Sequence, residues 1–219
     1  HLREHHQVTI ENENAMKRNE IEESEEACLG VDGDFDVEDL EKDSGLFDAE
    51  LENAFPLLKD FFMRANLSPW HPPKKEGFLR FLVARKSYAE NKLLLNLVTT
   101  SAELDRFDME AFVKLLKTIL GNRFAGLLHT INDSIGDRIQ ATDGNCTLIY
   151  GEDKIVENLL GLNFEISMQS FFQTNPKCAE KLYAKVIEYV KCTQDKQEVV
   201  LDLFCGTGTI GQLIAAQLP

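Results

Sequence analysis

The chain of 219 residues has 23 lysines and arginines against 37 aspartates and glutamates, and its formal net charge of −14 argues against phosphate binding by the surface as a whole. No apolar run approaches the roughly 20 residues of a membrane span, and no secretory signal opens the sequence. The five cysteines form no C-x-x-C pair, so they predict neither a zinc site nor a disulfide framework, and they favour the cytosol or the interior of an organelle.

Residues 1–50 carry most of the charge imbalance. Within residues 1–60 there are 19 acidic and 5 basic side chains, whereas residues 61–219 contain 18 of each. Runs such as Glu20–Glu26 and Asp32–Asp39 repel themselves and bury little apolar surface. We therefore predict an acidic, disordered leader over residues 1–50. The net charge does not exclude nucleic acid as a partner of the rest of the chain.

Residues 51–160 are predicted to form an α+β central domain. Apolar residues at helical spacing predict helices near Leu51–Phe62 and over Phe107–Leu120. Apolar and alternating runs predict strands at Phe78–Lys86, Leu93–Thr100, Gly126–Asn132, Arg138–Ala141 and Cys146–Tyr150. We expect these strands to form an antiparallel sheet covered by one or two helices.

Residues 161–219 predict the start of a different architecture. A strand at Leu162–Ile166 and a helix over Pro176–Cys192 precede an apolar strand at Glu198–Phe204. A glycine-rich turn then leads into a helix from about Thr209. This alternation is typical of a parallel sheet with helices on its faces, so the fold class is α/β. So few parallel strands indicate the N-terminal part of a Rossmann-like domain that is truncated here.

The glycine-rich turn matches the pattern G-x-G-x-x-G with Gly206, Gly208 and Gly211. Such a turn lets a ligand approach the backbone at the N-terminus of a helix. Asp202, just before it, can orient the cationic methionine end of S-adenosylmethionine or the loop itself. This favours S-adenosylmethionine over a nicotinamide dinucleotide, whose ribose-binding carboxylate would lie about 20 residues further on, beyond Pro219. A glycine-containing turn that binds no ligand is the third interpretation.

Several segments together resemble the RNA (uracil-5-)-methyltransferases, a family that acts on tRNA or ribosomal RNA. The strongest are Asp202–Gly211, with the glycine motif, and Ile166–Asn175, with the sequence Phe-Phe-Gln-x-Asn. Gly77–Arg85 is similar to a strand of the family's central domain, and Tyr150–Asp153 to the entry into its catalytic region. The resemblance covers residues 72–219, with the segments in order and in register.

The resemblance implies S-adenosylmethionine as the cofactor and an α/β methyltransferase fold. It implies that the amide of Gln173 contacts the cofactor, that Phe204 forms a wall of its pocket and that Thr209 makes a polar contact. The full set of implied cofactor-binding residues is Gln173, Asp202, Phe204, Gly206, Gly208 and Thr209. From the residues alone, Phe171 and Phe172 are expected in the core, and Gln173 would be a helix cap or a surface amide.

The resemblance also implies a reaction. In this family a cysteine thiolate adds to C6 of uracil, C5 takes the methyl group, and a base removes the C5 proton before the cysteine leaves. The family places that cysteine and base beyond Pro219, so no catalytic residue is assigned in this chain. Cys205, beside the glycine turn, is interpreted as a small packing residue. We expect the 219-residue chain to be a monomer that is inactive by itself.

Basic and aromatic residues are interleaved over residues 61–100, which contain seven lysines and arginines and only two glutamates. This composition suits phosphate contacts and base stacking, although an ordinary solvated strand would also show it. The alternation of a strand puts Arg80 and Lys86 on one face and Arg85 on the other. We expect Arg80 and Lys86 to project together toward RNA, and Arg85 to join them or to lie at a domain interface.

Two further functions stay open from the sequence. The same glycine turn could serve an NAD(P)-dependent oxidoreductase. Alternatively, the chain could be a non-catalytic RNA-binding fragment that keeps the central domain.

Overall fold

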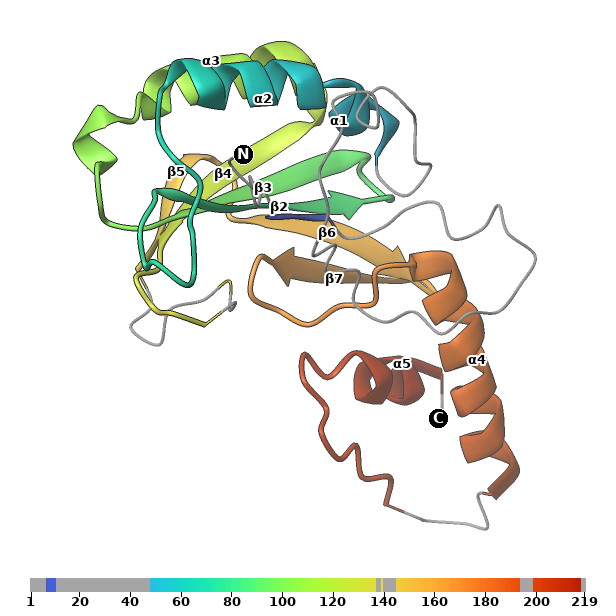
Figure 1. Cartoon of the computed structure of the whole chain (residues 1–219). Coiled ribbons are helices and arrows are strands. Elements are labelled where there is room, and N and C mark those ends of the chain that lie inside the picture. The colour runs from blue at the N-terminus through green and yellow to red at the C-terminus, as the bar shows by residue number, and fades with distance from the viewer. Residues whose placement is uncertain (1–6, 11–47, 137–138, 140–144, 194–198, 218–219) are drawn as a thin grey trace.

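The computed structural model describes residues 7–10, 48–136, 139, 145–193 and 199–217 (Figure 1). Most of the predicted leader and of the strand predicted at 138–141 lies outside these residues. Two short 3₁₀ helices, at Leu104–Arg106 and Gly121–Arg123, flank the third α-helix. The other elements are β1 (Gln7–Ile10), α1 (Ala49–Asn53), α2 (Phe55–Arg64), β2 (Leu79–Ser87), β3 (Lys92–Thr99), α3 (Met109–Leu120), β4 (Phe124–Ile131), β5 (Cys146–Gly151), β6 (Lys154–Leu159), β7 (Leu162–Ser167), α4 (Pro176–Thr193) and α5 (Thr209–Gln217).

The larger sheet has the strand order β1-β2-β3-β4-β5, and β6 pairs with β7 in a separate antiparallel hairpin. The expectation of an antiparallel sheet is wrong in two places, because β1 pairs with β2 in parallel and β3 pairs with β4 in parallel. Between β3 and β4 the chain crosses over through α3, and such a helical crossover returns the chain in the same direction. The sheet is therefore mixed.

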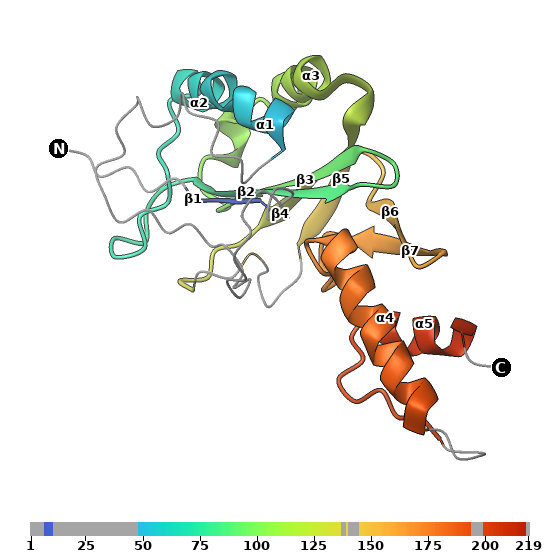
Figure 2. The same ribbon diagram turned by 90° about the vertical axis from the view of Figure 1, so that its right-hand side faces the viewer.

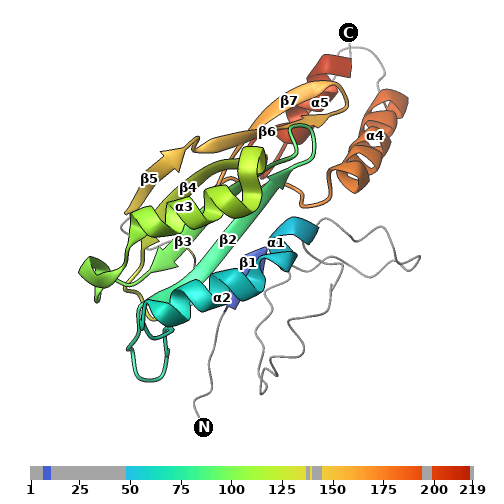
Figure 3. The ribbon, with the colours of Figure 1, turned by 90° about the horizontal axis from the view of Figure 1, so that it is seen from above.

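Strands β2 and β3 of the larger sheet are covered on both faces. Helices α1, α2 and α3 lie over one face, and the β6–β7 hairpin with α4 lies on the other side (Figures 1 and 2). Seen from above, α2 and α3 run side by side along the strands (Figure 3). Consecutive residues of β2 and β3 are consequently buried, which explains their continuous apolar sequences.

Each face has its own hydrophobic core. Under the helices, a group of phenylalanine rings packs with centroids 5.3 to 6.2 Å apart, namely Phe61, Phe62, Phe78, Phe107 and Phe112. The second core joins Phe81 and Val83 of β2 to Phe164 of β7 and Leu213 of α5. Burial of one such side chain contributes about 1.5–3 kcal/mol. Residues before and after position 160 share this second core, so the core does not divide the chain there. The predicted boundary between two domains at that position stays a prediction.

Residues 199–204 were predicted as a strand, and this prediction is wrong. No described strand lies beside them, so the ladder of backbone hydrogen bonds that defines a strand cannot form. Their apolar side chains face solvent, with Val199 84% exposed and Leu201 74% exposed. The helix predicted from Thr209 is confirmed as α5.

Among the described residues, no helix is long and apolar enough to cross a bilayer.

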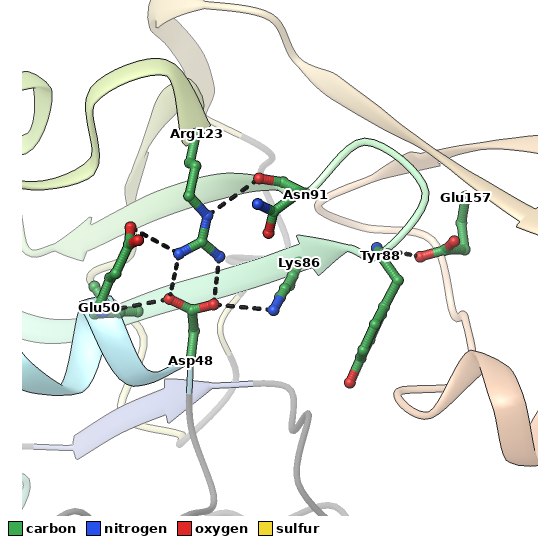
Figure 4. Close-up of polar contacts among 8 residues, drawn as sticks. Asp48, Glu50, Lys86, Tyr88, Asn91, Arg123 and Glu157 are labelled. Atoms are coloured by element: carbon green, nitrogen blue, oxygen red, sulfur yellow. Dashed lines mark hydrogen bonds and ion pairs between the residues drawn. The ribbon is translucent and has the colours of Figure 1, made fainter.

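A cluster of charges joins α1 to the sheet (Figure 4). The carboxylate of Asp48 accepts a hydrogen bond from the backbone N–H of Leu51 and so caps α1. Arg123 donates to both oxygens of Asp48, and Lys86 lies 3.0 Å from the same carboxylate. Glu50 pairs with Arg123 at 2.8 Å. Burial and the charge of Arg123 lower the pKa of Lys86 from 10.5 to about 8.

We expect the substitution Lys86→Met to change how stability depends on pH. The lowered pKa of Lys86 means that between pH 8 and 10.5 the unfolded chain binds more protons than the folded chain, so the free energy of unfolding rises with pH in this window. Lys86→Met should flatten that rise, as measured by urea unfolding at roughly pH 7.5 and roughly pH 9.5. Lys114→Met, at an exposed lysine of α3, is the control and should leave the slope unchanged. Equal slopes for both variants would contradict the role of Lys86.

Candidate functional site

The Phe-Phe-Gln-x-Asn element forms the connection between β7 and α4. It begins at a tight turn in which the carbonyl of Ser167 accepts hydrogen bonds from the backbone N–H and the hydroxyl of Ser170, at 3.3 and 3.0 Å. It ends at Asn175, whose side-chain oxygen accepts from the backbone N–H of Cys178 at 3.1 Å. Asn175 is therefore the N-cap of α4, with Pro176 in the first helical position. Both ends of the element are fixed by local hydrogen bonds.

Between these two ends, the side chains of the element differ in burial. Phe172 is buried and packs against Phe164 with ring centroids 6.2 Å apart. Phe171 is 66% exposed, so its expected place in the core is wrong. Gln173 turns toward α4: burial raises the pKa of Tyr183, and a hydrogen bond with the side chain of Gln173 opposes this rise. Gln173 therefore lies close to a residue of α4.

A pocket lies where this element meets the end of β2. From the element and the start of α4 it is lined by Phe172, Gln173, Thr174 and Pro176, with Ile166 of β7 beside them. From β2, its following turn and β6 it is lined by Arg85, Lys86, Tyr88 and Glu157. The structure therefore brings Gln173, predicted to contact the cofactor, together with two of the three cations predicted to contact RNA.

The carboxylate in this pocket is engaged by backbone groups. Glu157 is 2% exposed and accepts hydrogen bonds from the backbone N–H groups of Tyr88, Ala89 and Asn158, at 2.7, 3.0 and 3.0 Å. Burial, Glu157 and Asp48 raise the pKa of Tyr88 to about 12. The hydroxyl of Tyr88 therefore stays protonated, and able to donate a hydrogen bond, to a higher pH than that of an ordinary tyrosine.

The glycine turn adopts the backbone that its sequence requires. Gly206 and Gly208 have φ angles of 53° and 72°, in the left-handed region that glycine adopts without strain. One oxygen of Asp202 accepts from the backbone N–H of Gly211 at 3.0 Å, and a Cβ at Gly211 would lie 3.1 Å from that oxygen. Thr209 is buried, and its hydroxyl lies 2.9 Å from that of Thr207. Asp202 therefore orients the loop, one of its two predicted roles.

Two side chains near the glycine turn are exposed. Phe204 has a left-handed φ of 64° and a fully exposed side chain, and its role as a wall of the cofactor pocket stays a prediction. Cys205 was interpreted as a packing residue, and this is wrong because it is exposed as well. No lining residue of the pocket beside Gln173 comes from the described part of residues 199–217. The second core nevertheless joins Phe172 of the Phe-Phe-Gln-x-Asn element to Leu213 of α5, the helix that follows the glycine turn.

The expectation that Arg80 and Lys86 project together is wrong. A register shift between Leu79 and Phe81 interrupts the alternation of β2 at Arg80. Arg80 is 4% exposed and donates to the carbonyls of Asn132, Ser134 and Gly136, at 2.8, 2.5 and 2.7 Å. Lys86, at the other end of the strand, pairs with Asp48. Arg85 is also buried, and it donates to the carbonyl of Ser167 at the end of β7. Its alternative role at a domain interface stays a prediction.

Two exposed cations of the same basic stretch lie in the loop before β2. Lys74 and Lys75 are at its tip, which is closed by a bridge between His71 and Glu76. Gly77 ends the loop with a φ of 111°, where a Cβ would lie 2.1 Å from a backbone oxygen. The Pro-Pro-Lys-Lys sequence is a turn signal, and it could have indicated that these two lysines face solvent.

The described residues show no group of three or more histidine, cysteine, aspartate or glutamate side chains placed to hold a metal ion. Of the described cysteines, Cys146 is partly buried, whereas Cys178, Cys192 and Cys205 are exposed. None of these four cysteines lines the pocket beside Gln173. The polar groups gathered there therefore include no thiol nucleophile.

We expect Asp202→Ala to loosen the start of α5. The substitution removes the acceptor of the Gly211 N–H and should reduce local stability by about 1 kcal/mol, the usual loss for a helix cap. Amide hydrogen exchange at Gly211 and its neighbours should then become faster. Asp202→Asn keeps an acceptor oxygen and serves as the control. Unchanged exchange in the alanine variant would show that Asp202 does not hold the loop.

Curated bacterial proteins resemble the chain in sequence. An uncharacterized RNA methyltransferase of Clostridium tetani is 42% identical over 174 residues, which are 78% of this chain and 37% of that protein. One of Caldanaerobacter subterraneus is 37% identical over 171 residues, again 78% of this chain and 37% of that protein. The chain thus spans little more than a third of the length of these relatives. No protein-family model matches the chain.

A solved structure resembles the chain in fold. It is the crystal structure of the Pyrococcus abyssi tRNA (uracil-54, C5)-methyltransferase in complex with S-adenosyl-L-homocysteine, with a TM-score of 0.54 and 27% sequence identity. The match covers 77% of this chain and 38% of the other. It confirms the α/β fold class, and with the curated relatives it confirms the recognition from sequence motifs. By sequence and by fold, this chain belongs to the RNA methyltransferases.

Proposed function

We propose that the chain is part of an enzyme that transfers a methyl group from S-adenosylmethionine to C5 of a uridine in tRNA or ribosomal RNA. The observation that carries this proposal is the position of Gln173, in a pocket and next to the capped N-terminus of α4. The solved methyltransferase that shares this fold at 27% identity contains S-adenosyl-L-homocysteine and acts on a uracil C5. Both observations support a cofactor site around the Phe-Phe-Gln-x-Asn element.

In this proposal the chain binds and orients the cofactor, and the groups that make and break bonds come from elsewhere in the protein. Gln173 supplies an amide to the cofactor, and the glycine turn supplies backbone N–H groups at the start of α5. The cysteine that adds to C6 and the base that removes the C5 proton would belong to the larger part of the relatives' length that this chain does not match. We accordingly expect no turnover by the 219 residues alone.

We place the RNA contact of the central domain at the loop with Lys74 and Lys75. Both side chains are exposed, whereas Arg80 and Arg85 are buried with backbone carbonyls as partners. Trp70, at the base of this loop, lies under the guanidinium of Arg80 at 4.9 Å, so the loop is anchored to β2 by a cation–π contact. A fixed loop with two solvated cations fits a phosphate backbone.

The first test is cofactor binding by the full-length protein. We expect calorimetry to detect S-adenosylhomocysteine and not NADH, and Gln173→Ala to weaken this binding about tenfold, as expected for the loss of one buried hydrogen bond. Gln169→Ala, an exposed amide in the same connection, is the matched control and should bind normally. Binding of NADH instead would favour the oxidoreductase. Binding of RNA with neither ligand would favour a non-catalytic RNA-binding protein.

The second test is the salt dependence of RNA binding. Replacing Lys74 and Lys75 with glutamate should reduce the slope of log K against log salt by about 1.4 to 1.8, because two phosphate contacts are lost. The paired control replaces Lys114 and Lys181, exposed lysines of α3 and α4, in the same way. Equal slopes for the two double variants would remove the loop from the RNA contact.

A further inference from the structure

Arg85 connects the central sheet to the element that carries Gln173. Its side chain is 8% exposed, and Nη1 donates to the carbonyl of Ser167 at 2.9 Å. Ser167 is the last residue of β7, and the same carbonyl accepts the two hydrogen bonds from Ser170 that form the turn. The guanidinium therefore meets the chain at the point where the Phe-Phe-Gln-x-Asn element leaves the hairpin.

We infer that Arg85 is a positioning residue for the cofactor site. Arg85 and Gln173 line the same pocket, and Arg85 fixes the turn six residues before Gln173. Loss of this contact would let the turn move relative to β2, and with it Gln173, which lines the pocket. The inference rests on the proposed function, since it takes Gln173 as the residue that contacts S-adenosylmethionine.

The end of β2 that holds Arg85 is itself firmly attached to the hairpin. The hydroxyl of Ser87, two residues on, donates to the carbonyl of Val156 in β6 at 2.5 Å. The carboxylate of Glu157 accepts from the backbone N–H groups of Tyr88 and Ala89, in the turn between β2 and β3. These contacts anchor the β2–β3 turn on β6, while Arg85 anchors β2 on the end of β7. The central sheet thus sets the position from which the cofactor element starts.

The same strand supplies a matched control. Arg80 is also a buried arginine of β2, is 4% exposed and also donates to backbone carbonyls. Its partners, however, belong to the loop after β4, and it does not line the pocket beside Gln173. Arg80→Met and Arg85→Met therefore each remove a buried guanidinium from its carbonyl partners, but only the second removes a contact to the cofactor element.

The experiment compares these two variants, and Arg85→Lys, in the full-length protein. We expect Arg85→Met to raise the Kd for S-adenosylhomocysteine and the KM for S-adenosylmethionine roughly tenfold, with the KM for RNA unchanged. Arg85→Lys keeps a donor and should recover part of the loss. Arg80→Met should lower the Tm without changing cofactor affinity in the folded protein.

Two results would overturn the inference. If Arg80→Met weakens cofactor binding as much as Arg85→Met, the effect is general loss of stability. If Arg85→Met leaves cofactor affinity intact and instead weakens RNA binding with a smaller salt slope, Arg85 is an RNA contact. Failure of the unmodified protein to bind S-adenosylhomocysteine is a separate outcome, because it would remove the proposed function before any variant is compared.

Discussion

The burial of β2 on both faces is the constraint on which the other contacts depend. A strand covered by helices on one side and by a hairpin on the other leaves its cations no route to water along most of its length, and a buried charge requires partners. Arg80 satisfies this need with carbonyls of the loop after β4, Arg85 with the carbonyl that ends β7, and Lys86 with the carboxylate that caps α1. Each cation thereby fixes a different segment to the same strand.

This arrangement changes the meaning of the basic stretch. A local excess of positive charge indicates nucleic-acid binding only if the charges reach solvent. Arg80, Arg85 and Lys86 instead hold other segments of the chain against β2. Lys74 and Lys75, in the loop before β2, are exposed, and on them we base the proposed RNA contact. One acidic residue of the N-terminal part also has a structural role, because Asp48 is buried in a cluster with Arg123 and Lys86.

Local patterns predicted the regular elements well and their pairing poorly. Apolar spacing located α3 and α4, the glycine turn located the start of α5, and apolar runs located β2, β3, β4, β5 and β7. All of these signals depend on residues that are near neighbours in the chain. The parallel pairing of β3 with β4 follows from the crossover through α3, a feature of topology rather than of either strand. Residues 199–204 have the composition of a strand, but a strand also needs a partner beside it.

The sequence by itself determined the fold class, the cofactor motifs and the family, because these reside in short segments whose residue types and spacing are visible without a structure. Only the tertiary structure decided which members of those segments face solvent, which face a pocket and which serve as internal anchors. Gln173 and Phe171 stand two residues apart, yet one faces α4 and the pocket and the other faces water. Burial is set by segments distant in the chain, so neither composition nor periodicity encodes it for a single residue.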